Sequence, residues 1–96
     1  MTTISVTYHG GSDYLVVVDE DGSSTTHTVT VWPSDVERYA PGSAPEDLVE
    51  ASFRFLLERE PKESILQRFE LPIIERYFPD YRRTIRSMMG DSDDPR

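Results

Sequence analysis

Residues 43–60 place the tightest constraint on how this chain can fold. The segment begins with Ser43-x-x-Glu46, the pattern of a capping box, carries Pro45 in its first turn and stops before Pro61, so it predicts one long helix. Stepping 100° per residue, its inward side chains cover an arc of about 200°. These side chains are Leu48, Val49, Ser52, Phe53, Phe55, Leu56 and Leu57. One sheet face cannot cover so wide an arc, so we expect this helix to contact two layers.

Three short segments that precede this helix predict the first layer, an antiparallel sheet. Residues 3–9 alternate polar and apolar side chains, as a half-exposed strand does. Residues 13–20 form a nearly continuous apolar run that is typical of a strand with neighbours on both sides, and residues 25–32 alternate again. Tight loops rich in Gly, Asp and Ser join the three segments. The sequence therefore predicts a three-stranded antiparallel β-meander with residues 13–20 in its centre.

Prolines predict the second layer, because Pro61, Pro72 and Pro79 are each placed to start a short helix. The apolar residues that these three helices carry are Ile65, Leu66 and Phe69 in the first, Ile73, Ile74, Tyr77 and Phe78 in the second, and Tyr81, Ile85, Met88 and Met89 in the third. Gly90 is a stop signal for the last helix, and a further capping box, Ser34-x-x-Glu37, predicts a short helix after the third strand.

Together these elements predict an α+β fold in a single domain. A three-stranded antiparallel β-meander is followed by a long helix and a cluster of short helices, all packed on one sheet face. The domain is expected to span residues 1–89. Residues 90–96 are too polar to pack, so we expect a disordered acidic tail there.

The net charge of −8 is unevenly distributed along the chain. Residues 1–53 contain nine acidic side chains and one basic one, whereas residues 54–86 contain eight basic and six acidic ones. We expect arginines of the second half to be neutralised within the chain or by a neighbouring copy. The chain has no cysteine, which excludes disulfides and thiolate sites, and no segment has the length and apolarity of a signal peptide or membrane span. We therefore expect a cytoplasmic protein.

No residue pattern points to a catalytic, cofactor-binding or metal site. We expect His9 and His27 to lie at opposite ends of the sheet, more than about 15 Å apart, with His9 exposed and His27 half-buried, so they cannot share an ion. The loop around Asp19, Asp21 and Ser23 resembles the opening of a calcium loop but lacks the later ligands, which favours a solvated hairpin. Nucleophile and phosphate-loop motifs are missing too. A small enzyme with a carboxylate-based site remains an open alternative, although nothing singles out two carboxylates.

Nucleic-acid binding is a second alternative, supported by Arg82, Arg83 and Arg86 along one edge of the last predicted helix. Affinity for phosphates requires a net basic surface, and the overall charge of −8 opposes it. The same charge argues against anionic membranes. We expect these arginines to pair with acids of the first half such as Asp35 and Glu37, or to be solvated.

Protein binding is the function that the sequence favours. The wide apolar arc is either covered within the chain by Ile65, Leu66, Ile73 and Ile74, or part of the aromatic cluster after residue 52 is a contact surface, and a two-fold homodimer is the commonest use of such a surface. The candidate interaction surface is Tyr77, Tyr81, Arg82 and Arg86, residue types that interfaces favour. We therefore interpret the chain as a non-catalytic protein-interaction or regulatory module that binds a protein partner or a second copy.

One run of the sequence bears on the source and location of the protein, and not on its function. The segment SFRFLLEREPKESIL, followed by YFPDY, resembles a run in small bacterial proteins of unassigned function. The resemblance covers about residues 45–81. It implies a bacterial, cytoplasmic protein, and it implies no activity, cofactor or site residue.

Overall fold

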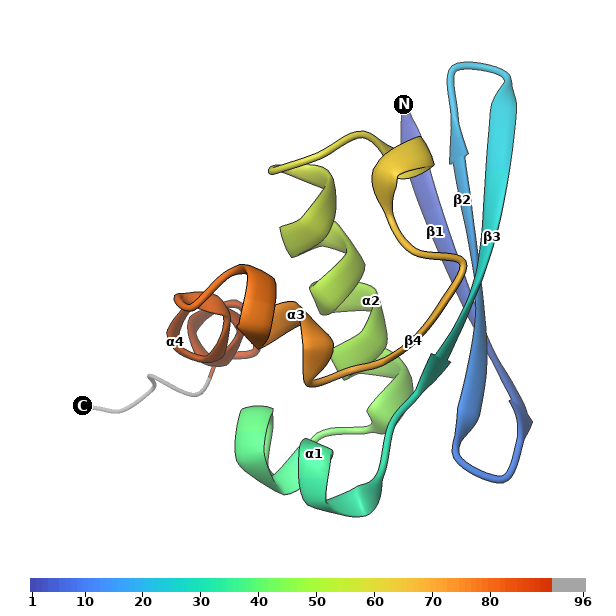
Figure 1. Cartoon of the computed structure of the whole chain (residues 1–96). Coiled ribbons are helices and arrows are strands. Elements are labelled where there is room, and N and C mark those ends of the chain that lie inside the picture. Colours follow the sequence, from blue (N-terminus) through green and yellow to red (C-terminus); the bar gives the residue numbers. More distant parts are fainter. Residues whose placement is uncertain (91–96) are drawn as a thin grey trace.

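Helix α2 (Pro45–Leu57) lies between two layers, as its wide apolar arc predicts. The computed structural model describes residues 1–90. A β-sheet covers one side of α2, and helices α3 (Ile73–Tyr77) and α4 (Tyr81–Met88) cover the other (Figure 1). The fold class is therefore α+β, with the helices on one face of the sheet.

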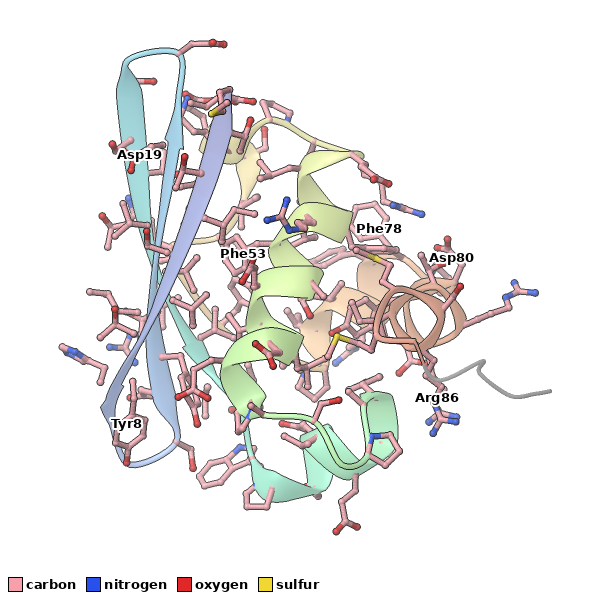
Figure 2. All side chains as sticks on the ribbon, turned by 180° about the vertical axis from the view of Figure 1, so that it is seen from behind. Tyr8, Asp19, Phe53, Phe78, Asp80 and Arg86 are labelled. Carbon is pink, nitrogen blue, oxygen red and sulfur yellow. The ribbon has the colours of Figure 1, made fainter. Side chains whose placement is uncertain are left out.

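Two phenylalanines show how one helix reaches both layers. Phe53 and Phe55 are two residues apart, so their side chains point in nearly opposite directions from the helix. The Phe53 ring centroid lies 5.2 Å from that of His27 in the sheet. The Phe55 ring centroid lies 5.8 Å from that of Phe78 and 5.2 Å from that of Tyr81, on the helical side. Phe53 lies on the side of α2 that faces the sheet, and Phe78 lies on the opposite side (Figure 2). Both phenylalanines of α2 are fully buried, so α2 joins the two halves of the core.

The sheet has four strands in the order β1-β2-β3-β4. β1 (Thr2–Gly10), β2 (Asp13–Glu20) and β3 (Ser23–Thr30) are antiparallel neighbours, which confirms the predicted meander. β4 (Arg68–Glu70) was not predicted, and it pairs with β3 in parallel. The sheet is therefore mixed and four-stranded, not three-stranded and purely antiparallel.

The predicted helix after Pro61 is wrong. Residues 62–64 form one 3₁₀ turn, η1 (Lys62–Ser64), and the chain then becomes extended. The Thr28 N–H donates to the Gln67 carbonyl at 2.7 Å, and the Leu71 N–H donates to the Thr30 carbonyl at 3.0 Å. Backbone pairing with β3 thus supplies the hydrogen bonds that a helix would have made, and it explains why the sequence pattern misled.

The helix starts differ from the predicted capping boxes. Helix α1 (Pro33–Tyr39) begins at Pro33, and the Asp35 carboxylate accepts the Trp32 N–H at 2.9 Å. Helix α2 also begins at a proline, after Ala44, and makes no side-chain cap. Proline at the first helical position fixes the backbone angle there and loses no hydrogen bond, so it sets the start in both helices. The predicted capping serines, Ser34 and Ser43, do not.

The later helices follow the prolines as predicted. α3 starts after Pro72, α4 starts shortly after Pro79, and Gly90 adopts a φ of +78° just beyond α4. Apart from Gly90, the predicted acidic tail lies outside the described residues.

Candidate functional site

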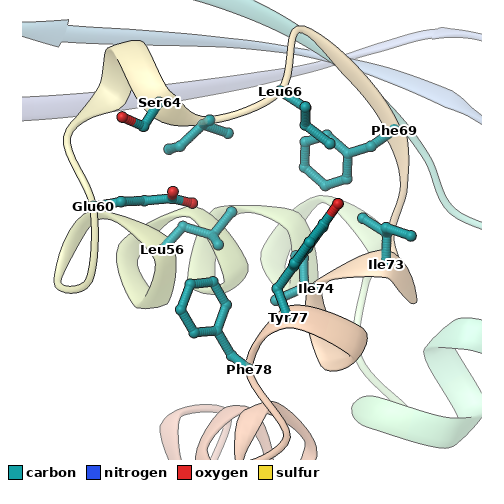
Figure 3. Close-up of a pocket in the computed structure, with 10 residues that line it drawn as sticks. Leu56, Glu60, Ser64, Leu66, Phe69, Ile73, Ile74, Tyr77 and Phe78 are labelled. Carbon is teal, nitrogen blue, oxygen red and sulfur yellow. The ribbon is translucent and has the colours of Figure 1, made fainter.

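An apolar groove lies between the C-terminal end of α2, the segment from η1 to β4, and α3 (Figure 3). Its volume is about 390 Å³. The lining residues are Leu56, Glu60, Ser64, Ile65, Leu66, Phe69, Ile73, Ile74, Tyr77 and Phe78. Concave apolar surfaces with a few polar groups are the usual form of a binding site.

The floor of the groove belongs to the core, whereas its rim is exposed. Leu56, Ile65 and Ile74 are buried, so burial against the rest of the domain holds them in place. Leu66 and Tyr77 on the rim are 49% and 67% exposed. Exposed apolar side chains that gather at one groove are a feature of contact surfaces, so this groove is the candidate site.

Glu60 gives the groove its charge. The Glu60 carboxylate points into the groove (Figure 3), and within residues 1–90 it makes no hydrogen bond or ion pair. The Tyr77 hydroxyl points toward the side where Leu66 and Phe69 lie. Among the described residues that line the groove, Glu60 is the only charged one. The groove therefore suits an apolar group that carries a positive charge or a hydrogen-bond donor.

His27 fixes one wall of the groove to the sheet. Its Nδ1 lies 2.8 Å from the Leu66 carbonyl, and its Nε2 lies 2.8 Å from the Thr25 hydroxyl. Because a carbonyl can only accept, Nδ1 carries the proton and donates to Leu66. His27 is 1% exposed, so the predicted half-burial understates its position. Its role is to position the segment that carries Leu66.

The two histidines do not share a site, although the predicted reason is partly wrong. His27 lies opposite Val16, which lies opposite Val6, so His27 sits at the middle of the sheet and not at its far end. His9 is exposed near the end of β1. In residues 1–90, no group of three or more His, Asp or Glu side chains is placed to hold a metal ion.

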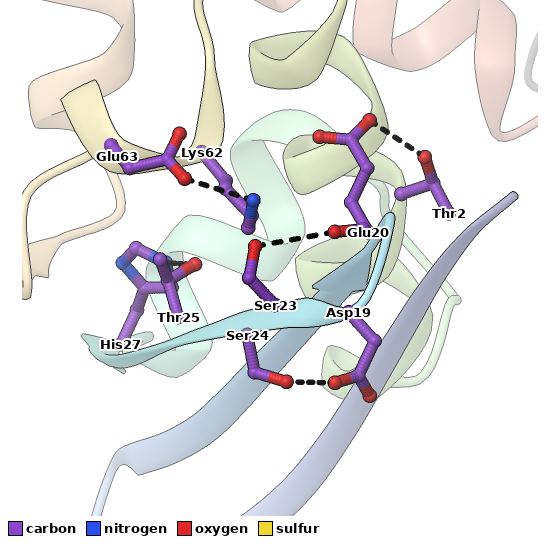
Figure 4. A network of polar contacts seen from close by, with 9 residues as sticks. All are labelled: Thr2, Asp19, Glu20, Ser23, Ser24, Thr25, His27, Lys62 and Glu63. Carbon is purple, nitrogen blue, oxygen red and sulfur yellow. Dashed lines mark hydrogen bonds and ion pairs between the residues drawn. The ribbon is translucent and has the colours of Figure 1, made fainter.

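The acidic loop after β2 is a hairpin, as predicted. Asp21 and Gly22 have φ values of +53° and +83°, which is typical of a two-residue hairpin turn. Asp19 accepts a hydrogen bond from Ser24, and Glu20 accepts one from Thr2 at 2.9 Å (Figure 4). These carboxylates bond to neighbouring strands and do not converge on a common point.

A lysine of η1 is buried near the same end of the sheet. The Lys62 side chain is 6% exposed, and its Nζ lies 2.9 Å from the Glu63 carboxylate (Figure 4). This hydrogen bond raises the pKa of Lys62 and lowers the pKa of Glu63. The pair thus stays charged near neutral pH, and it lies within the turn that precedes the groove wall.

The predicted interaction surface is divided by the fold. Tyr77 is exposed on the rim of the groove, but Tyr81 is fully buried. The Tyr81 hydroxyl lies 2.6 Å from the Ser52 hydroxyl, and burial raises the pKa of Tyr81. Placing Tyr81 on the surface was wrong, because its ring faces Phe55 and closes the second layer of the core.

The arginines of α4 have separate surroundings. Arg86 donates from Nε and Nη2 to the Arg38 carbonyl at 3.2 and 2.8 Å, at the C-terminal end of α1. Arg82 Nε lies 3.9 Å from the Glu75 carboxylate, and Arg83 is exposed. The Asp35 carboxylate, a predicted partner of these arginines, instead accepts the Trp32 N–H as described above.

Neutralisation within the chain is mostly local to the second half. Arg59 lies 2.9 Å from the Asp80 carboxylate, and its guanidinium stacks 3.6 Å from the centre of the Phe55 ring. Arg54 pairs with Glu50 of the first half at 2.8 Å, so the arginines named here are neutralised within the chain, as one of the two expected arrangements.

Leu66 and Glu60 were not recognised as site residues from the sequence. The predicted helix after Pro61 placed Leu66 in the core, and Glu60 appeared as one more acid at a helix end. The signal that could have revealed the extended segment after Leu66 is the alternation of charged and apolar residues from Arg68 to Leu71, which fits a strand, whereas no comparable signal marks Glu60.

Comparisons of the chain with protein-family models, with curated proteins and with solved structures find no match. The resemblance of residues 45–81 to small bacterial proteins therefore stays a prediction. In the described part of the chain, no helix is long and apolar enough to cross a membrane.

Proposed function

We propose that this chain is a non-catalytic protein-interaction module that binds a short segment of a partner protein in the groove beside Tyr77. The observation that carries the proposal is the contrast between rim and floor. Leu66 and Tyr77 are exposed, while the apolar residues of the floor are buried in the core. Interfaces gain most of their affinity from a few aromatic and aliphatic anchors in such pockets.

The charge of the groove specifies the partner segment. The segment should carry one or two aliphatic or aromatic side chains for the floor and a lysine or arginine for Glu60. The net charge of −8 also draws a basic segment toward the surface and accelerates its association.

The alternatives have weaker support. A carboxylate-based enzyme needs two carboxyl groups that face each other, and Glu60 is the only carboxylate among the described lining residues. For nucleic acid, the bonds from Arg86 to the Arg38 carbonyl leave Arg82 and Arg83 as the exposed cations of the predicted edge. Two arginines on a strongly acidic domain are a poor phosphate-binding surface.

A random peptide library displayed on phage tests the proposal, with purified wild-type protein as bait and the Tyr77→Glu variant as counter-selection. We expect peptides with apolar residues next to a lysine or arginine. By calorimetry, Tyr77→Glu should weaken their binding at least tenfold, which corresponds to about 1.4 kcal/mol. Glu60→Gln should weaken basic peptides more than their lysine-to-norleucine analogues.

Met88→Glu is the matched control, because Met88 is 40% exposed on α4 and does not line the groove. It adds the same charge as Tyr77→Glu and should leave peptide affinity unchanged. Failure to enrich any peptide, or equal loss of binding with both variants, would contradict the proposal.

A further inference from the structure

Strand β1 is an unprotected edge of the sheet. It is terminal in the strand order, so one side of its backbone has no strand partner within residues 1–90. Its nine residues present about 30 Å of free edge. Natural sheets normally blunt such an edge with charged side chains, proline, a bulge or a short strand. β1 contains no charged side chain and no proline, and its only irregularity is at its end, between Tyr8 and Gly10.

The opposite edge of the same sheet is protected in the expected way. β4 is three residues long, and its two outer residues, Arg68 and Glu70, are charged and exposed. β4 thus has the short length and charged side chains that protect an edge, and β1 lacks both. This contrast indicates that β1 is available for pairing with another strand.

We propose that β1 pairs in antiparallel fashion with β1 of a second copy, which joins two sheets into one of eight strands. A two-fold axis perpendicular to the sheet brings each residue opposite one on the same face. With the axis at Val6, Val6 faces Val6 of the second copy, Ile4 faces Tyr8, and Ser5 faces Thr7. Aliphatic, aromatic and hydroxyl pairs of these kinds stabilise neighbouring strands.

The charge distribution explains why we propose a second copy of the chain, and not another protein, as the partner of β1. Each copy carries a net charge of −8, so two copies can approach only where acidic side chains are few. β1 has none, whereas the adjacent β2 contains Asp13, Asp19 and Glu20. A basic strand from another protein would find no carboxylate on β1 to pair with. In addition, Ile4 and Val6 are only partly buried, so pairing would remove more of their apolar surface from water.

Analytical ultracentrifugation of the full chain tests this pairing. The wild-type protein should sediment as a dimer of twice 11.0 kDa at micromolar concentration. Ser5→Lys/Thr7→Lys should raise the dimer dissociation constant at least tenfold, because lysines then face lysines across the axis whether it passes through residue 5 or residue 6. Ser24→Lys/Thr26→Lys is the matched control, with two exposed residues of β3 away from this edge, and it should remain dimeric.

Charge reversal separates pairing from loss of the fold. Ser5→Glu/Thr7→Glu should also be monomeric, and mixing it with Ser5→Lys/Thr7→Lys should restore a dimer that contains one of each. Thermal unfolding followed by circular dichroism checks that each variant is folded. Tyr77→Glu should leave the mass unchanged, so the groove and β1 are tested independently.

Three results would overturn the inference. The first is a wild-type protein that stays monomeric at hundreds of micromolar. The second is an equal rise of the dimer dissociation constant in the β1 variants and in the β3 control, which would indicate that two copies contact each other through the solvent-exposed face of the sheet. The third is a dimer that Tyr77→Glu breaks and the lysines on β1 do not.

Discussion

The hydrogen bond between Ser52 and Tyr81 allows a quantitative test of the core. Both residues are fully buried, and the Ser52 hydroxyl donates to the Leu48 carbonyl at 2.7 Å. A hydroxyl has one proton, so the Tyr81 hydroxyl must be the donor in the 2.6 Å bond to Ser52. The two side chains therefore depend on each other unequally.

Removing one hydroxyl or the other should therefore lower the free energy of unfolding by different amounts. Tyr81→Phe removes a donor but leaves Ser52 bonded to Leu48, so we expect a loss of about 1 kcal/mol in the free energy of unfolding. Ser52→Ala leaves a buried tyrosine hydroxyl without an acceptor, which should cost about 1–3 kcal/mol. The double variant contains neither polar group, so it should be no less stable than Ser52→Ala alone.

Equilibrium unfolding in urea at pH 7, followed by far-ultraviolet circular dichroism, measures all four proteins of this cycle. At about 4–8 °C per kcal/mol, thermal midpoints provide a second readout. If both single variants lie within about 0.5 kcal/mol of wild type, Tyr81 behaves as a surface residue and the proposed packing is wrong. A larger loss for Tyr81→Phe than for Ser52→Ala would refute the donor assignment, and strictly additive losses in the double variant would mean that the two hydroxyls do not interact.

Two further predictions concern α1 and the groove wall. Burial and the hydrogen bond donated to Glu75 at 2.8 Å raise the pKa of Tyr39 from 10.0 to about 12. The protonated tyrosine is thus favoured in the folded state, and its contribution is complete below pH 10 and lost between pH 10 and 12, by about 1.4 kcal/mol per pH unit. The stability difference between wild type and Tyr39→Phe in urea unfolding should shrink by about 1 kcal/mol between pH 10 and 11, because the unfolded tyrosine is already half ionised at pH 10, and a constant difference would contradict it. His27→Leu should accelerate amide hydrogen exchange in the segment around Leu66 more than in β1 and β2, because the bond to the Leu66 carbonyl is lost. Uniform acceleration throughout the sheet would mean that His27 does not specifically hold the groove wall.

Local signals in the sequence determined much of the fold. The alternation in residues 3–9, the Asp21-Gly22 turn and the prolines before α3 and α4 each act within a few residues, so they can be read without knowledge of distant contacts. The arc of about 200° on α2 also predicted two layers, because the width of an apolar stripe reports how much of a helix must be covered.

The tertiary structure alone decided β4, the groove and the position of Tyr81. The strand at 68–70 exists because β3 offers free backbone groups 40 residues earlier in the chain, and no local pattern reports such a partner. Tyr77 and Tyr81 are four residues apart, and each has an arginine next to it in the sequence. One is nevertheless exposed, and the other is buried against Phe55. Which of them is covered depends on where a whole helix packs, and that is settled by the sum of contacts over the domain.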